Sequence, residues 1–481
     1  MSIKKISLLE LFLWLFIFVL LLTLLSPLVM GVKIKHDYPG ILKRLSDTLN
    51  VDIKINKYDQ GFFSSNLDLS LMIPGFAETI KFKEKIIHGP IYFGLLSQRK
   101  WPFATAVVQG KLDASTSQHA WLTKVFSNND TLVYQAIISY LGEIDSQLYL
   151  PAINAHLQDE IGQIYINSAG IIINQHYSPV SQHVNAEINI AKLKFKSTLF
   201  SLITDSVNIS FTGYKGGNAL LIGDSIVSVS LLDFYSGVDQ FAVKDLVLRS
   251  VSSEEGHLIN TFNQLKVREL LTSNQKFGPL VFNLNINGIN AESLKQLKLL
   301  QQENKSKLAQ GVSTEQINKI ARTKIISLLP NMIKQIDMNV SPLSIASELG
   351  QLQAKLDFKL DNISPDILEN PMLLLTAINF DLDLTVDPLL LKQLVRWEFE
   401  KNVQGLLDLS IVKSDASSTP PKAPNVATSI QRMLDKNWLV SRDQGYFAKI
   451  TMQKGELLVN NKLVSPFEKI TTSKANVAVV Q

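Results

Sequence analysis

The sequence predicts an α+β protein dominated by β structure: a long, twisted antiparallel sheet with packed helices, preceded by one N-terminal transmembrane helix. Three observations predict this class. Short runs that alternate apolar and polar residues recur from residue 51 onward and are separated by Gly, Asn, Ser and Asp, which is typical of antiparallel strands with one wetted face. Several of these runs pass directly into helix-like segments, and a charge-free apolar run lies near the N-terminus.

Length and composition exclude some functions. A chain of 481 residues exceeds one ordinary domain, so we expect several domains or one elongated, repetitive body. The formal charge of +4, from 47 basic and 43 acidic residues, is too small to neutralise many phosphates, so no nucleic-acid partner is predicted. The absence of cysteine excludes thiolate nucleophiles, thiolate metal ligands and disulfides.

The first element is a predicted membrane anchor over residues 1–31. Residues 11–30 contain no charged side chain, and twenty helical residues span about 30 Å, the thickness of a bilayer's hydrocarbon core. A cleaved signal peptide is the alternative, but its apolar region is usually only about 7–15 residues long. We therefore expect a retained signal-anchor with a cytoplasmic N-terminus and a translocated body.

Residues 32–290 are predicted to be mainly antiparallel β structure. A short helix is expected to start at Pro39 and Gly40, because the apolar residues after them are helically spaced: Ile41, Leu42, Leu45 and Leu49. Alternating strands follow from residue 51. A helical insertion is predicted near 115–145, where apolar residues cluster three and four apart.

Residues 291–411 are predicted to form a helical segment and repeats of a strand followed by a short helix. Helix N-caps are expected at Asn290, Ser364 and Asp387, and Pro365 and Pro388 fit the first helical position. Looser copies are expected at 336–350 and 188–203; the alternative is a coincidence among amphipathic elements. A further helix should begin with a capping box of Ser313 and Gln316 and carry an apolar stripe of Ile317, Ile320, Ala321, Ile325 and Leu328.

The last two segments are a linker and a sheet extension. Residues 412–429 are rich in Pro and Ser and lack periodicity, as in linkers. Residues 430–481 are predicted to contain a short helix and a β-hairpin, with its turn at Lys454 and Gly455, that completes the sheet.

No catalytic, cofactor-binding or metal-binding residue is predicted, no cofactor is expected, and ligand-binding residues are unknown. His88 precedes Gly89 and Pro90, but only Glu84 and lysines are nearby in sequence, so a turn with a backbone hydrogen bond is favoured over a general base. Asp381 and Asp383 should lie about 7 Å apart on one strand face, where a solvated surface is favoured over paired catalytic acids. His176 and His183 lack metal-ligand spacing.

Several short motifs indicate a family. The apolar N-terminal run is followed by "YDQGFFSS", "IIHGPI", "FGPLVFNLNINGINAESL" and, near the end, "GELLVNNKLV". In this order they resemble the YdgA-like family of bacterial envelope proteins, although the linker at 412–429 is longer and richer in Pro than the family pattern. The resemblance implies a Gram-negative inner-membrane or periplasmic protein of unestablished activity. The strand and short-helix units are also similar to those of AsmA-like envelope proteins, a group associated with lipid transport.

We therefore expect a non-enzymatic, single-pass protein of the bacterial inner membrane, with its bulk in the periplasm. Its expected partners are the membrane, through residues 11–30, and a lipid or another apolar ligand in a sheet-lined groove. One alternative is a periplasmic scaffold that binds other envelope proteins through exposed strand edges and the 412–429 loop. Another is an enzyme with an unrecognised site. The lipid hypothesis requires that the protein's own helices leave part of the apolar sheet face uncovered.

Overall fold

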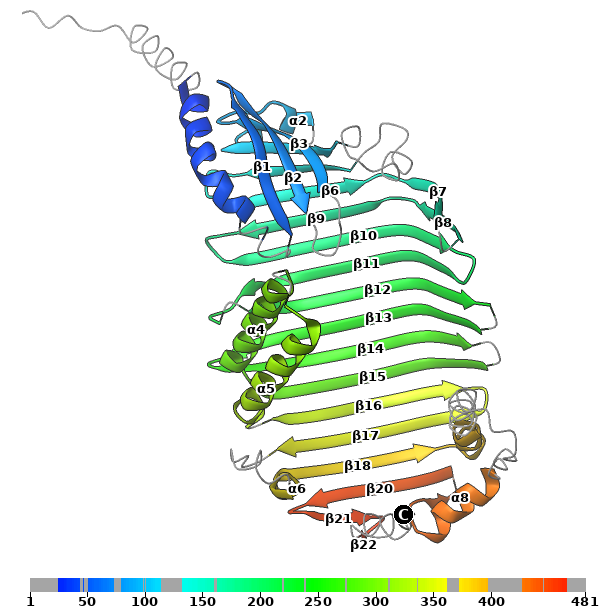
Figure 1. Ribbon diagram of the computed structural model, residues 1–481. Helices are drawn as coiled ribbons and strands as arrows, with labels where there is room; N and C mark the ends of the chain where they lie inside the picture. The colour runs from blue at the N-terminus through cyan, green and yellow to red at the C-terminus, as the bar shows by residue number, and fades with distance from the viewer. Residues whose placement is uncertain are drawn as a thin grey trace, which may run out of the picture. The chain divides into compact units, whose positions relative to one another are not determined.

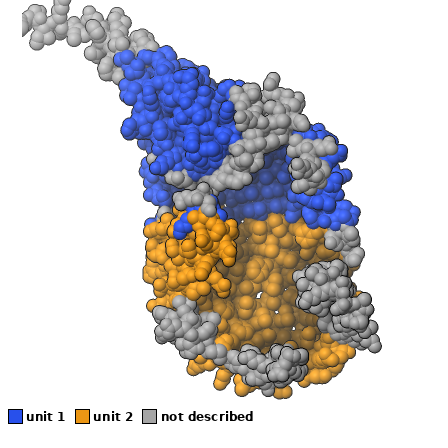
Figure 2. Space-filling model, viewed as in Figure 1, with its two compact units in different colours: residues 1–217, 225–238, 305–311 blue, residues 218–224, 239–304, 312–481 orange. Residues whose placement is uncertain are grey.

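A computed structural model describes most of the chain, and β strands dominate it. The described residues are 25–43, 46, 51–72, 79–97, 99, 101–113, 132–159, 162–218, 220–237, 239–272, 275–309, 312–334, 336–360, 372–396, 426–443 and 445–464. They form two compact units (Figure 2). Unit 1 comprises residues 1–217, 225–238 and 305–311, and unit 2 comprises residues 218–224, 239–304 and 312–481.

Unit 1 contains an open antiparallel sheet (Figure 1). Its strands are β1 (Asp52–Gln60), β2 (Ser64–Met72), β3 (Thr79–His88), β4 (Ala106–Leu112), β5 (Val133–Ile138), β6 (Ile144–Leu150), β7 (Ile153–Asp159), β8 (Gly162–Ser168), β9 (Ile171–Ser178), β10 (His183–Lys196) and β11 (Ser201–Lys215). β1 to β6 pair in chain order, β6 pairs with β9, and β9 pairs with β10 and β10 with β11. The β7–β8 hairpin joins β10 through β8. Most residues of β12 (Leu221–Ser236) also belong to this unit.

Unit 2 contains a second run of antiparallel strands. They are β13 (Asp239–Glu255), β14 (Leu258–Thr272), β15 (Gln275–Asn290), β16 (Asp337–Ser347), β17 (Gly350–Leu360), β18 (Ile378–Val386), β20 (Gly445–Gln453), β21 (Glu456–Val459) and β22 (Lys462–Val464), paired in that order. The short β19 (Val440–Arg442) also pairs with β20. The helices whose residues belong wholly or mostly to unit 2 are α4 (Ala291–Ala309), α5 (Thr314–Met332), α6 (Met372–Ala377), α8 (Val426–Asp435) and residues 388–396. The short α2 (Gly94–Ser97) belongs to unit 1.

The predicted anchor lies mostly outside the described residues, which start at residue 25. Residues 25–43 form one continuous helix, so Pro39 and Gly40 lie inside a helix rather than at its start. Within the described ranges, no helix is both long and apolar enough to cross a membrane. The helix of residues 25–43 buries Ile34, Tyr38 and Leu42 against β2, β3 and β4. There they form one apolar cluster with Leu67, Ile86 and Val108. This tertiary packing explains why the helix continues through two residues that usually weaken helices.

The structure corrects the helical insertion predicted near 115–145. Residues 133–138 form β5 and residues 144–150 form β6, while residues 114–131 lie outside the described ranges. Val133, Tyr134, Ile137 and Ile138 favour strands. β4 and β6 also pair with β5 on its two sides, so strand pairing outweighs the helix-like spacing of the apolar residues.

The predicted pattern of a strand followed by a helix is present at two positions. β15 leads directly into α4, where Asn290 Oδ1 accepts a hydrogen bond from Ser293 N at 2.9 Å. β18 leads into the helix at 388–396, although Asp387 Oδ2 accepts from Gln351 N at 2.8 Å. The predicted helix after β17 lies outside the described residues. The prediction of two looser copies of this pattern, at 336–350 and 188–203, is wrong. Residues 337–347 are all strand, and residues 188–203 lie in the β10–β11 hairpin.

The predicted capping box and terminal hairpin are present. Ser313 Oγ accepts from Gln316 N at 3.3 Å at the start of α5. Of the predicted α5 stripe, Ile317 is buried, whereas Ile320 and Ile325 are exposed. β20 and β21 turn at Lys454 and Gly455. Residues 426–429 of the predicted linker belong to α8, and the rest of that linker lies outside the described residues.

Candidate functional site

Strand alternation and register give the sheet of unit 2 one face of apolar side chains. Three cross-strand rows define this apolar face. The middle row is Leu284, Val340, Leu356, Leu382, Ile450 and Val459. On one side of it lie Ile286, Met338, Phe358, Phe380, Met452 and Leu457, and on the other lie Phe282, Leu343, Ala354, Leu384 and Ala448.

Helices cover the two ends of the apolar face more than its middle. At one end, Ile333, which follows α5, and Ala377 of α6 pack with Phe358 and its neighbours. At the other end, Val386 and Leu390 are fully buried. Between them, Leu356, Leu382 and Ile450 are only half-buried, and Figure 2 shows unit 2 hollowed in this region. Among the residues that the structure describes, the helices therefore leave the middle of the apolar face only partly covered.

The opposite face of the same strands is polar, and Asp381 and Asp383 lie there. Lys449 Nζ lies 3.4 Å from Asp381 Oδ2 and 3.6 Å from Asp383 Oδ1. Lys355 Nζ lies 2.8 Å from Asp357 Oδ2 and lowers the pKa of that carboxyl mainly through their hydrogen bond. A lysine between the two aspartates makes them part of a surface ion-pair network, as the sequence favoured.

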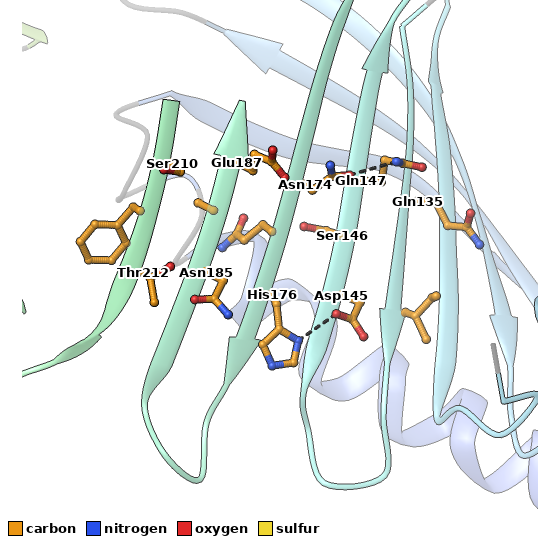
Figure 3. Close-up of a pocket in the computed structure, with 14 residues that line it drawn as sticks. Gln135, Asp145, Ser146, Gln147, Asn174, His176, Asn185, Glu187, Ser210 and Thr212 are labelled. Atoms are coloured by element: carbon orange, nitrogen blue, oxygen red, sulfur yellow. Dashed lines mark hydrogen bonds and ion pairs between the residues drawn. The ribbon is translucent and has the colours of Figure 1, made fainter. Parts of the chain in front are cut away.

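Unit 1 carries a shallow polar cavity of about 350 Å³ (Figure 3). The register of β5, β6, β9, β10 and β11 aligns one row of polar side chains across it: Gln135, Gln147, Asn174, Glu187 and Ser210. Gln147 Nε2 donates to Asn174 Oδ1 at 2.9 Å. In the next row His176 Nδ1 lies 2.8 Å from Asp145 Oδ1. This arrangement can hydrogen-bond a polar ligand.

Sequence reasoning missed this cavity. His176 was considered with His183, but the side chain that it contacts is Asp145 on the neighbouring strand. Alternation within one strand shows which residues share a face, but it does not show which distant strands are neighbours. The amide residues at alternating positions of these strands were a signal in the sequence, but only the strand register shows that they line up with one another.

His88 is a structural residue. Its Nε2 lies 2.9 Å from Ser65 Oγ and its Nδ1 lies 3.2 Å from the carbonyl oxygen of Phe62. The His88 side chain lies beside Gly31 of the 25–43 helix. Because His88 is 3% exposed and Ser65 is 0% exposed, a substrate cannot reach this pair. The predicted backbone contact is present, and Glu84 is hydrogen-bonded elsewhere, to Tyr38.

Comparison with known proteins identifies the family. A family model described as a bacterial protein of unknown function (DUF945) matches residues 7–467. The chain belongs to the DUF945 family. No match was found among curated proteins or among solved structures. The match fits an uncharacterised bacterial family; the narrower YdgA-like resemblance stays an expectation.

The described residues of this DUF945 protein form surfaces on which a ligand can bind. Among the described residues, no group of three or more His, Cys, Asp and Glu side chains is placed to hold a metal ion. Two of the surfaces that can receive a ligand are the apolar face of unit 2 and the polar cavity of unit 1.

Proposed function

We propose that this protein binds the hydrocarbon chain of a lipid along the apolar face of unit 2. The observation that carries the proposal is the half-buried centre of that face, where Leu356, Leu382 and Ile450 lie on three neighbouring strands. A hydrocarbon chain needs no hydrogen-bond partner, and the side chains of this face offer none. An apolar ligand is therefore favoured over a polar one.

The dimensions of the face suit an acyl chain. The row from Leu284 to Val459 crosses six strands, which is about 24 Å at roughly 4.8 Å between strands. One leaflet of a bilayer's hydrocarbon core is about 15 Å thick. Burying about 400 Å² of apolar surface contributes roughly 10 kcal/mol before the costs of association are subtracted.

We also propose the place where this binding happens. Residues 11–30 would anchor the chain in the bacterial inner membrane, with a cytoplasmic N-terminus and a periplasmic body. The length and apolarity of that segment support the anchor, and the family is bacterial. An anchored apolar groove would lie close to a source of lipid.

Native mass spectrometry of the full chain, released from detergent micelles, tests lipid binding. We expect adducts with lipid masses that reach a fixed stoichiometry. Leu356→Asp and Leu382→Asp should reduce their occupancy by about tenfold or more, because a carboxylate in the groove must lose its hydration when a hydrocarbon chain covers it.

Gln353→Asp and Thr385→Asp are the matched controls, since both residues lie on the opposite face of the same strands. These variants should keep the adducts. Lipid that binds all four variants equally would be membrane lipid held by the anchor, and the proposal would then fail.

A further inference from the structure

Nine large apolar side chains are exposed on the loops and the short helix α2 that connect strands at one end of unit 1. We call them the loop rim: Phe62, Phe63, Phe93, Leu96, Trp101, Phe103, Tyr140, Leu141 and Val180. Trp101 is 82% exposed, Val180 78%, Phe93 72% and Leu141 70%. Large apolar side chains that are exposed close to one another usually mark an interaction surface.

Hydrogen bonds hold three of these loops together. His88 N donates to the carbonyl oxygen of Phe63 at 2.8 Å, and this hydrogen bond joins the residue before β2 to the end of β3. Tyr140 Oη donates to the carbonyl oxygen of Pro90 at 2.9 Å, which joins the β5–β6 loop to the β3–β4 loop. Trp101 and Phe103 stack with their ring centroids 6.5 Å apart. These contacts therefore hold the loops of the rim in a defined arrangement.

The 25–43 helix enters unit 1 beside the rim. Its Met30 and Gly31 lie against Gly89 and His88, at the point where β3 passes into the rim loop 89–105. The first turns of this helix also expose Leu25, Leu28, Val29 and Val32. These turns continue the charge-free run of residues 11–30. The rim thus lies where the chain would leave a bilayer.

We infer that the loop rim inserts into the membrane–water interface and seats unit 1 on the bilayer surface. Trp and Tyr are the side chains enriched at this depth, because their rings are apolar and their N–H and O–H groups are polar. The rim loops 89–105 and 139–143 contain two basic residues, Arg99 and Lys100, and one acidic residue, Glu143, so their net charge is positive. This charge suits anionic lipid headgroups.

The inference goes beyond the proposed lipid binding, which concerns unit 2, and it rests on the proposed anchor at residues 11–30. The occupant of the rim is a bilayer surface containing anionic lipid. A second protein that covered the rim would be a different result, and the experiment below distinguishes the two.

Single-cysteine spin labelling tests the rim, because the chain has no cysteine of its own. The full chain is placed in vesicles of zwitterionic and anionic phospholipid, and flotation first shows whether it is anchored. Labels at positions 93, 101 and 141 are then exposed to oxygen, which concentrates in lipid, and to a water-soluble nickel complex. We expect oxygen to relax these labels more than nickel does. A label at Leu463, 67% exposed on β22, should show the reverse.

Three outcomes overturn the inference. In the first, the chain does not float with the vesicles, so residues 11–30 do not anchor it. In the second, nickel relaxes the rim labels more than oxygen does, so the rim lies in water. In the third, neither reagent relaxes the rim labels, so another protein covers the rim. Phe93→Glu combined with Trp101→Glu should remove the oxygen preference of the label at 141. Leu463→Glu, the matched control, should leave it unchanged.

Discussion

A buried hydrogen bond joins Tyr38 to Glu84 in unit 1. Tyr38 Oη donates to Glu84 Oε2 at 2.8 Å, and both side chains are buried. Burial raises the pKa of Glu84 from 4.5 to about 7, although the hydrogen bond from Tyr38 acts to lower it. Burial, followed by the charge and hydrogen bond of Glu84, raises the pKa of Tyr38 well above 10. The pair joins the 25–43 helix to β3.

This pair predicts how stability depends on pH. Because the folded pKa of Glu84 is raised above its ordinary 4.5 to about 7, its contribution is fully present below pH 4.5 and is lost as pH rises through 7. The loss is about 3 kcal/mol in the free energy of unfolding. Glu84→Gln keeps an acceptor for Tyr38 without a charge, so it should remove this loss.

Urea unfolding of the full chain in detergent at pH 5, 6, 7 and 8 measures the effect. The stability of Glu84→Gln relative to the unsubstituted chain should increase with pH across this series. Parallel curves for the two proteins would show that Glu84 does not titrate in this range, and the assigned burial would be wrong.

At the scale of single elements, the 25–43 helix offers a matched pair of glycines. A Cβ on Gly31 would lie 2.5 Å from a ring carbon of His88, whereas nothing lies within 4 Å of a Cβ on Gly40. Gly31→Ala should therefore destabilise the protein by about 1–3 kcal/mol, because it forces the helix away from β3. Gly40→Ala should be neutral or stabilising by about 0.5–1 kcal/mol.

Denaturant unfolding at one pH distinguishes the two alanine variants, and limited proteolysis reports the helix itself. We expect faster cleavage within residues 25–43 for Gly31→Ala only. Equal stability and equal cleavage of the two variants would mean that the helix does not pack on His88.

Elements with local signals were predictable from sequence, and those set by distant neighbours were not. Ser313 and Asn290 cap their helices as expected because capping needs only residues three positions apart. The apolar residues of 133–138 are spaced as in a helix, but their types favour a strand, and pairing with β4 and β6 decided the outcome. The partner of Glu84 lies 46 residues earlier in the chain, so no local pattern could reveal it.

At the scale of the whole molecule, the sequence predicted the character of the sheet better than its sites. Alternation in β15 to β18 placed apolar residues on one face of each strand, and the structure shows that these faces coincide from strand to strand. The coincidence depends on register, and so do the alignment of polar residues around His176 and the cluster of loop-rim side chains. These features appear only once distant strands are paired.

Photo-crosslinking in living bacteria shows whether lipid occupies the apolar face of unit 2. A benzophenone amino acid replaces Leu356 or Leu382 in the full chain, and Gln353 or Thr385 on the opposite face serves as the control. Our account predicts lipid-mass adducts at positions 356 and 382 and none at 353 and 385. Adducts on both faces alike, or crosslinks from 356 and 382 only to the protein's own helices, would contradict it.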